Sequence, residues 1–272
     1  MVHIGNFSVR VFFLSGVFFR LRHTPIVKSS DVCLLCPHLA SHLLLYMVEM
    51  ISLLPSNKQS CFWRVFLTGC LWTLSSSITF VKTQKYLSIF YKNLRQTSQE
   101  IKQTKYFVVA TIATSQLIFI ALFVITFLYN GKVFTLLRND EKIIKYIKCT
   151  LYPYYLIIFI YVEFLLLICL IQSYRARKLP RNFNETKLIS LGVLLAQVFL
   201  LSYLIAGKGT DLLTEILMLN AANLSMVLNM YGWKTFVLLF RPHLNDVRLL
   251  NQDLLEMAYR KVDKQIENES SI

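Results

Sequence analysis

Residues 177–187 read Arg-Lys-Leu-Pro-Arg-Asn-Phe-Asn-Glu-Thr-Lys, and the apolar segment 188–206 follows directly. The stretch carries four basic side chains and one acidic one. A short basic loop that opens onto about 20 apolar residues is typical of the cytoplasmic end of a transmembrane helix. This stretch therefore predicts a membrane-spanning chain and places one span at 188–206.

The composition of the whole chain agrees with a membrane protein. It has 272 residues, of which 55% are hydrophobic and only 16% are charged, more apolar surface than one soluble core needs. Candidate spans lie at 4–20, 32–54, 62–81, 106–129, 151–173, 188–206 and 212–238. The third and seventh contain many Ser, Thr and Asn residues, which buried helix faces tolerate. We expect an all-α membrane protein with a bundle of seven transmembrane helices.

The net charge of +14 is spread over the short loops between spans, which argues against nucleic acid as a partner. With the N-terminus outside, 20 of the 29 Lys and Arg residues are cytoplasmic and 9 are external. The positive-inside rule therefore predicts an external N-terminus and a cytoplasmic tail. The basic inner surface also suits anionic membrane lipid, at about 1 kcal/mol per residue.

After the seventh span, Arg-Pro-His-Leu-Asn at 241–245 breaks the helix. Residues 246–264 then contain apolar residues among charged ones, at a spacing typical of an amphipathic helix on the membrane surface. We therefore divide the chain into a seven-transmembrane domain over 1–250 and a cytoplasmic amphipathic segment and tail over 251–272.

The six cysteines are too few and too scattered for a disulfide scaffold. Four of them fall within or at the edge of apolar spans and are expected to be core thiols: Cys33, Cys36, Cys70 and Cys169. Cys61 and Cys149 differ, because both are predicted on the outer side of the membrane. A disulfide bond would persist in that oxidising compartment.

The opening stretch closely resembles the third intracellular loop of family C G-protein-coupled receptors, the family of metabotropic glutamate and calcium-sensing receptors. Four further motifs resemble the family in the same order, at 23–30, 61–64, 81–83 and 234–242. They match its first inner loop, the Cys-x-x-Arg opening and Lys-Thr pair of its third helix, and the end of its seventh helix. The resemblance covers about residues 12–250 and implies a receptor, with a helix-seven ending of the metabotropic glutamate type.

The resemblance implies an ionic contact between Lys82 and Glu185, which we name the inter-helix lock. In such receptors it joins the inner ends of helices three and six in the resting state, and its opening would couple an external ligand to the cytoplasmic face. The alternative is two independent charges that face the headgroups. The resemblance also implies a disulfide bond between Cys61 and Cys149, with two free thiols as the alternative.

The resemblance further implies a heterotrimeric G protein as partner, together with membrane lipid and a homo- or heterodimer with a family C receptor. A multi-pass protein of the plasma membrane is expected. The residues expected to face the G protein are Lys28, Lys85, Lys92, Arg95, Lys102, Lys105, Arg177, Lys178 and Arg181. The alternative is plain positive-inside charge with no partner, because topology alone predicts it.

Ionisable groups inside a membrane are candidates for function. A possible cavity between the helices is assigned to Glu49, Glu163, Gln197 and Glu215. The alternative is a set of interhelical hydrogen bonds, worth about 0.6 kcal/mol each on average. His38 and His42 have the i, i+4 spacing of a metal site, but no third ligand is evident nearby. The sequence therefore predicts no metal, no cofactor and no enzyme activity.

Two departures from the family limit the resemblance. No extracellular clamshell domain precedes Met1, so the chain is expected to match only the seven-helix part of such receptors. In the sixth helix, Leu200, Tyr203 and Ile205 stand where the family has Trp, Phe and Pro. A non-signalling dimerisation or trafficking partner of a full-length family C receptor is therefore the alternative function.

Overall fold

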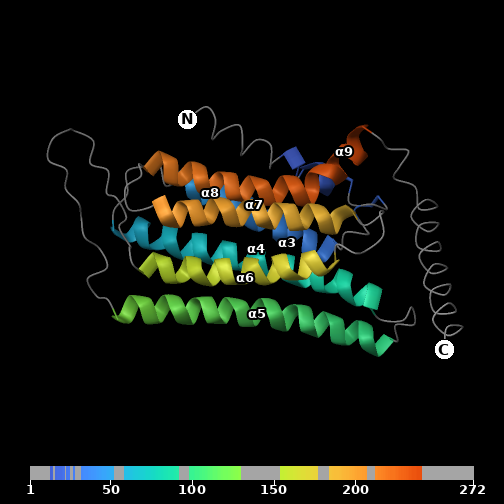
Figure 1. Cartoon of the computed structure of the whole chain (residues 1–272), viewed down its shortest axis with the longest axis horizontal. Coiled ribbons are helices and arrows are strands. Elements are labelled where there is room, and N and C mark those ends of the chain that lie inside the picture. The colour runs from blue at the N-terminus through green and yellow to red at the C-terminus, as the bar shows by residue number, and fades with distance from the viewer. Residues whose placement is uncertain are drawn as a thin grey trace, which may run out of the picture.

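The computed structural model describes residues 13–14, 16–21, 23–24, 27, 32–51, 58–91, 98–129, 154–176, 184–206 and 212–240, with only the backbone described at several helix ends. Its labelled elements are all helices. They are α3 (Val32–Ile51), α4 (Lys58–Tyr91), α5 (Ser98–Tyr129), α6 (Tyr154–Ala176), α7 (Asn184–Ala206), α8 (Leu212–Val227), η2 (Leu228–Gly232) and α9 (Trp233–Phe240). The helices run side by side along one long axis (Figure 1).

The all-helical prediction is confirmed for this part of the chain. Four described helices are long and apolar enough to cross a membrane: Cys33–Ile51, Phe62–Lys85, Tyr106–Ile125 and Lys187–Ile205. Near the predicted first span, residues 13–14 and 16–20 are helical. The predicted membrane-surface helix at 246–264 lies outside the described residues.

The helix ends differ from the predicted ones on the inner side of the third and fourth spans. The polar segment 84–105 was expected to be a loop, but α4 continues to Tyr91 and α5 already begins at Ser98. A hydropathy profile shows where the side chains of a helix stop being apolar, but the helix itself can continue into the polar segment. Both helices therefore extend past their apolar spans.

Helix α4 is the central element of the bundle, in contact with α3, α5 and α6. The span Phe62–Lys85 is 72% buried, whereas Tyr106–Ile125 in α5 is 17% buried, so α5 lies at the edge (Figure 1). The buried side of α4 is built of small hydroxyl residues: Thr73, Ser75, Ser76, Ser77, Thr79 and Thr83. Small side chains allow neighbouring helices to approach closely in a membrane. The Ser and Thr content that weakened the third predicted span therefore reflects its central position.

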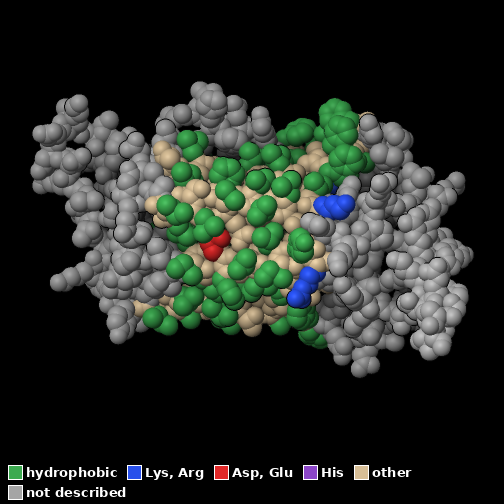
Figure 2. Space-filling model, viewed as in Figure 1, with side chains coloured by type: hydrophobic (Ala, Val, Ile, Leu, Met, Phe, Trp, Pro, Cys, Tyr) green, Lys and Arg blue, Asp and Glu red, His purple; other side chains and the backbone are tan. Residues whose placement is uncertain are grey.

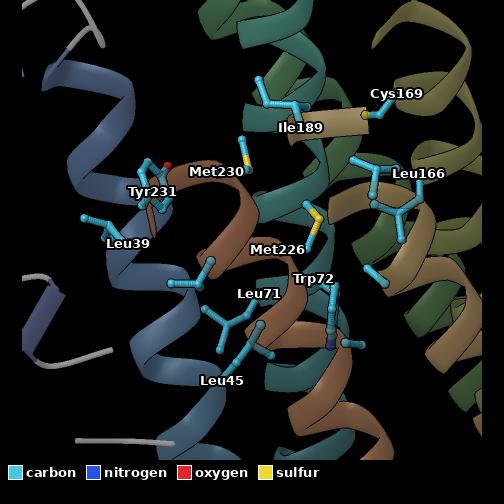
Figure 3. Packing of buried hydrophobic residues seen from close by; sticks show 14 of the residues in the cluster. Leu39, Leu45, Leu71, Trp72, Leu166, Cys169, Ile189, Met226, Met230 and Tyr231 are labelled. Atoms are coloured by element: carbon cyan, nitrogen blue, oxygen red, sulfur yellow. The ribbon is translucent and has the colours of Figure 1, made fainter. Parts of the chain in front are cut away.

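The apolar core lies between α3, α4, α6, α7 and α8. Trp72 is its largest fully buried side chain, and Leu45, Leu166 and Met226 belong to the same cluster (Figure 3). The outside of the bundle is apolar as well, because many large apolar side chains are exposed on the visible face (Figure 2). An apolar exterior is what a bundle surrounded by lipid requires.

The seventh predicted span is confirmed as a helix but is not uniformly α-helical. Helices α8 and α9 join through η2, a π-helical turn over Leu228–Gly232. Helix α7 packs so closely against η2 that a Cβ atom added at Gly192 would lie 2.9 Å from Asn229 Cβ. Asn229 of η2 therefore lies in the interface with α7.

Candidate functional site

Six polar side chains from four helical elements meet in the interior of the bundle. Each is at most 1% exposed, and we call the set the histidine network. Its members are His38 and His42 on α3, Ser75 and Thr79 on α4, Asn223 on α8, and Tyr231 on η2. Burying a polar group costs free energy unless it is hydrogen-bonded, so the contacts of these side chains decide what the site is.

The contacts of Asn223 fix the tautomer of His42. Asn223 Nδ2 donates to the main-chain oxygen of His42 at 3.2 Å, which identifies Asn223 Oδ1 as the acceptor for His42 Nδ1. A neutral imidazole that donates from Nδ1 accepts at Nε2. The hydroxyl of Ser75 lies 3.1 Å from that Nε2 atom and is placed to donate to it.

The contacts of His38 complete the network. Its Nε2 atom lies 3.4 Å from His42 Nε2, so a proton fits on only one of the two atoms. With His42 accepting, His38 has room for a proton on Nε2, and in that tautomer it donates to Ser75 Oγ at 3.1 Å. Its Nδ1 atom then accepts from the hydroxyl of Tyr231 at 2.5 Å. One continuous chain of hydrogen bonds therefore runs from Tyr231 to Asn223.

A metal ion is the other use that two facing imidazoles could have. Among the residues that the structure describes, no group of three or more His, Cys, Asp or Glu side chains could hold a metal. The ammonium group of Lys82 also lies 5.2 Å from the ring centre of Tyr231, beside the network. A divalent cation here would add buried positive charge with no anionic ligand, which is costly. The geometry favours a hydrogen-bonded network.

Lys82 occupies a buried position on α4 and is 5% exposed. Its Nζ atom lies over the ring of Tyr231, a cation–π arrangement that stabilises a charge away from water. Glu185 is the second residue of α7, and its side chain lies outside the described residues. The structure therefore places one half of the inter-helix lock, and the contact between the two residues stays a prediction.

The comparison with known families places this bundle. Residues 2–242 match the family described as "7 transmembrane sweet-taste receptor of 3 GCPR", which is most of the chain. The chain belongs to the family C G-protein-coupled receptors. Family membership points to a multi-pass membrane receptor and not to an enzyme.

Curated family C receptors align with nearly the whole chain. The extracellular calcium-sensing receptor of Sus scrofa is 26% identical over 247 residues, which cover 86% of this chain and 22% of that receptor. "G-protein coupled receptor family C group 6 member A" of Carassius auratus is 25% identical, covering 90% and 28%. "Probable metabotropic glutamate receptor mgl-1" of Caenorhabditis elegans is 22% identical, covering 93% and 26%. The chain thus spans about a quarter of the length of these relatives.

The cysteines of this family C receptor divide into three groups. Cys169 is fully buried and Cys70 partly so, as expected, but Cys33 and Cys36 are exposed on α3. The prediction of core thiols was wrong for these two, because an apolar span has a lipid-facing side as well as a buried one. Cys61 lies in α4, but its side chain is not among those described. Cys149 lies outside the described residues. Their disulfide bond stays a prediction.

Most residues expected to face the G protein lie outside the described side chains. Lys85 is half-buried near the inner end of α4. Lys102 and Lys105 belong to the first two turns of α5, where only the backbone is described. The others lie outside the described residues: Lys28, Lys92, Arg95, Arg177, Lys178 and Arg181. The docking surface stays a prediction.

The four residues assigned to a cavity are not brought together by any contact that the structure describes. Glu163 on α6 hydrogen-bonds Gln197 on α7, the interhelical arrangement that was the alternative, but its buried Oε1 atom has no hydrogen-bond partner among the described residues. Glu49 is 2% exposed, and neither of its carboxylate oxygens has a hydrogen-bond partner among the described residues. Glu215 is half-buried on α8.

Sequence reasoning missed the histidine network. The signals were present, since His38 and His42 share a helix face and the Ser and Thr residues of α4 recur at helical spacing. Asn223 and Tyr231 carried no comparable mark. The i, i+4 spacing of the histidines suggested metal ligands, whereas their partners are neutral hydroxyl and amide groups from helices distant in sequence.

Proposed function

We propose that this family C receptor chain transmits an extracellular signal across the plasma membrane to a heterotrimeric G protein, in the manner of metabotropic glutamate receptors. The N-terminus is external and the basic loops are cytoplasmic in this proposal. The observation that carries it is the burial of Lys82 at the inner part of the central helix. A buried ammonium group is costly unless a specific partner or switch requires it.

The proposed switch is the inter-helix lock. In the resting state Lys82 on α4 pairs with Glu185 at the start of α7, which ties the inner ends of these two helices together. Both helices contact α6, so a shift of either one is transmitted through a shared neighbour. Opening the lock separates the helices and exposes a cytoplasmic surface for the G protein.

The distribution of charge supports this orientation. The Lys and Arg side chains in view lie toward one end of the described bundle, and apolar side chains cover the length between (Figure 2). The cytoplasmic end in the proposed topology carries Lys85, and the basic segments 84–105 and 175–181 belong to that same end in this topology. These segments would present the positive surface to the G protein and to anionic lipid.

The test measures guanine-nucleotide exchange in membranes from cells that express the full chain with heterotrimeric G proteins. Glu185→Ala should raise the basal exchange rate several-fold over the unchanged chain, because it opens the lock. Lys187→Ala, an exposed change two residues along α7, is the matched control and should leave the rate unchanged. Exchange no higher than in membranes without the chain would contradict G-protein coupling. Coupling with an unchanged baseline in Glu185→Ala would contradict the lock alone.

A second candidate function is a non-signalling partner of a full-length family C receptor. The sixth helix favours it, because Leu200 is fully buried where the family resemblance has Trp, and Ile205 is 82% exposed where it has Pro. Co-expression separates the two functions. A non-signalling partner would co-purify with a family C receptor and change its surface level, with no nucleotide exchange of its own.

The cavity proposal rests first on Glu49, because Glu163 already has Gln197 as a partner for one of its two carboxyl oxygens. Tyr46 Oη, one turn before Glu49 on α3, and Asn220 Oδ1 on α8 also lack hydrogen-bond partners among the described residues. Acceptors of this kind would suit a ligand that donates hydrogen bonds. Binding of such ligands to the chain should be lost in Glu49→Met.

A further inference from the structure

The π-helical turn η2 changes which face of the seventh helix points into the bundle. A π turn holds one more residue than an α turn, and such turns occur often at functional sites. Each residue of an α-helix advances the direction of its side chain by about 100°. The extra residue in Leu228–Gly232 therefore sets the rotation of everything that follows, including α9.

Helix α9 has two different faces, so its rotation matters. Lys234, Thr235, Val237 and Leu238 are buried, whereas Trp233, Phe236, Leu239 and Phe240 are exposed. If η2 became α-helical, each residue of α9 would move to the direction that its successor now occupies. Trp233 would then turn from the exterior to the place of Lys234. An α-helical η2 would therefore be a second, discrete arrangement that differs from the present one by one residue in register.

The contact that fixes the present arrangement is made by Tyr231, which is 1% exposed and lies on η2 next to α3 (Figure 3). Its hydroxyl donates to His38 Nδ1 at 2.5 Å. Its ring packs edge-on against Phe18 and His38, with centroid distances of 5.6 Å in each case. Shifting the register of η2 would remove this side chain from all three contacts.

The rest of the histidine network makes the acceptor on His38 available. His38 can accept from Tyr231 only while its own proton is on Nε2, and Ser75 and Thr79 lie 3.1 Å and 3.2 Å from that atom to receive it. Ser75 can receive it because His42 accepts the Ser75 proton in turn. The network therefore suits the tautomer of His38 that accepts a hydrogen bond from the phenol.

We propose that the hydrogen bond between His38 and Tyr231 is an intramembrane latch that holds the seventh helix in its π-helical register. Opening the latch lets η2 return to α-helix, rotates α9 by about 100° and turns Trp233 inward. Tyr231 also carries Lys82 against its ring, so the latch and the inter-helix lock share one side chain. Only this last link rests on the proposed function.

Trp233 reports the rotation without any G protein. The full chain is reconstituted in vesicles of phosphatidylcholine whose acyl chains are brominated, which quench tryptophans that touch lipid. Trp63 is also exposed and is replaced in every sample by Trp63→Phe, whereas Trp72 is fully buried and stays. Adding Trp233→Phe to this background measures the residual emission of Trp72.

In the Trp63→Phe background, quenching of Trp233 is strong. It should fall by about half or more in His38→Ala and in Tyr231→Phe, because the residue leaves the lipid. His38→Asn restores an acceptor for the phenol and should restore the quenching. Tyr231→Phe removes a single oxygen atom and therefore keeps the test valid if His38→Ala does not fold. Unchanged quenching in a folded Tyr231→Phe chain would overturn the latch, whatever nucleotide exchange shows about signalling.

Discussion

His42 and Asn223 exchange two hydrogen bonds across the interface of α3 and α8. The imidazole donates from Nδ1 to the side-chain oxygen of Asn223, and the amide of Asn223 donates back to the main-chain oxygen of His42 at 3.2 Å. Both residues are fully buried. This reciprocal pair joins the second and seventh helices of the bundle at a point where neither side chain can reach water.

Replacing Asn223 should therefore destabilise the bundle. Asn223→Ala leaves His42 Nδ1 without its acceptor, which should lower the free energy of unfolding by about 1–3 kcal/mol. Asn220→Ala is the matched control on the same helix, since the Asn220 amide bonds only the oxygen of Ile216 one turn earlier. Denaturation of the chain in bicelles measures both. Equal losses in the two variants would contradict a special role for Asn223.

The contact between α7 and α8 depends on the absence of a side chain at Gly192. A Cβ atom there would lie 2.9 Å from Asn229 Cβ and 3.3 Å from the main-chain oxygen of Ser225. Gly192→Ala should therefore lower the unfolding free energy by about 1–3 kcal/mol, the usual cost of overpacking. Gly232→Ala is the control, because nothing lies within 4 Å of its added Cβ atom. A Gly192→Ala chain as stable as Gly232→Ala would show that the helices shift at no cost.

The all-helical fold could be predicted because apolar spans and basic loops alternate along the chain, and four of the described helices are long and apolar enough to cross a membrane. The core of α4 could be predicted only in part, since its Ser and Thr residues lower the hydropathy of the most buried helix. The π turn could not be predicted at all. Nothing in Leu228–Gly232 distinguishes it from α-helix in sequence. Its contacts are with residues far away in the chain: Tyr231 with His38 on α3, Met230 with Thr79 on α4, and the turn as a whole with α7.

Glu49 is a buried carboxyl group without a hydrogen-bond partner among the described residues. The positive charge of Arg64 attracts it electrostatically. Glu49→Met keeps the side-chain volume and removes the polar group. It should raise the unfolding free energy by about 1–3 kcal/mol, the cost of burying an unpaired polar group. Glu163→Met is the matched control and should stabilise less, because it also removes the hydrogen bond between Glu163 and Gln197. A loss of stability in Glu49→Met would mean that Glu49 has a partner in the membrane.

The predicted disulfide bond between Cys61 and Cys149 can be tested directly. Peptide mapping of the chain without reduction should recover the two cysteines in one cross-linked peptide. Cys61→Ser should release Cys149 as a free thiol, and Cys70→Ser serves as the control because Cys70 is already free. Recovery of both cysteines as free thiols from protein at the cell surface would rule the bond out.

One part of the candidate site could be predicted from the family resemblance, and the other part became visible only in the folded structure. Lys82 was predicted from a family motif, and its burial agrees with a special role. The histidine network has no such motif, because its partners come from α3, α4, α8 and η2 and meet only when the bundle forms. Long-range hydrogen bonds of this kind leave almost no local pattern in a sequence.

The central claim is that Lys82 and Glu185 hold the receptor in its resting state, and exchanging their charges tests it most directly. Lys82→Glu alone and Glu185→Lys alone should each raise the basal rate of guanine-nucleotide exchange, because each places like charges at the inner ends of α4 and α7. The double variant restores an opposite-charge pair and should return the rate to that of the unchanged chain. A double variant whose rate equals or exceeds that of the single variants would contradict the lock.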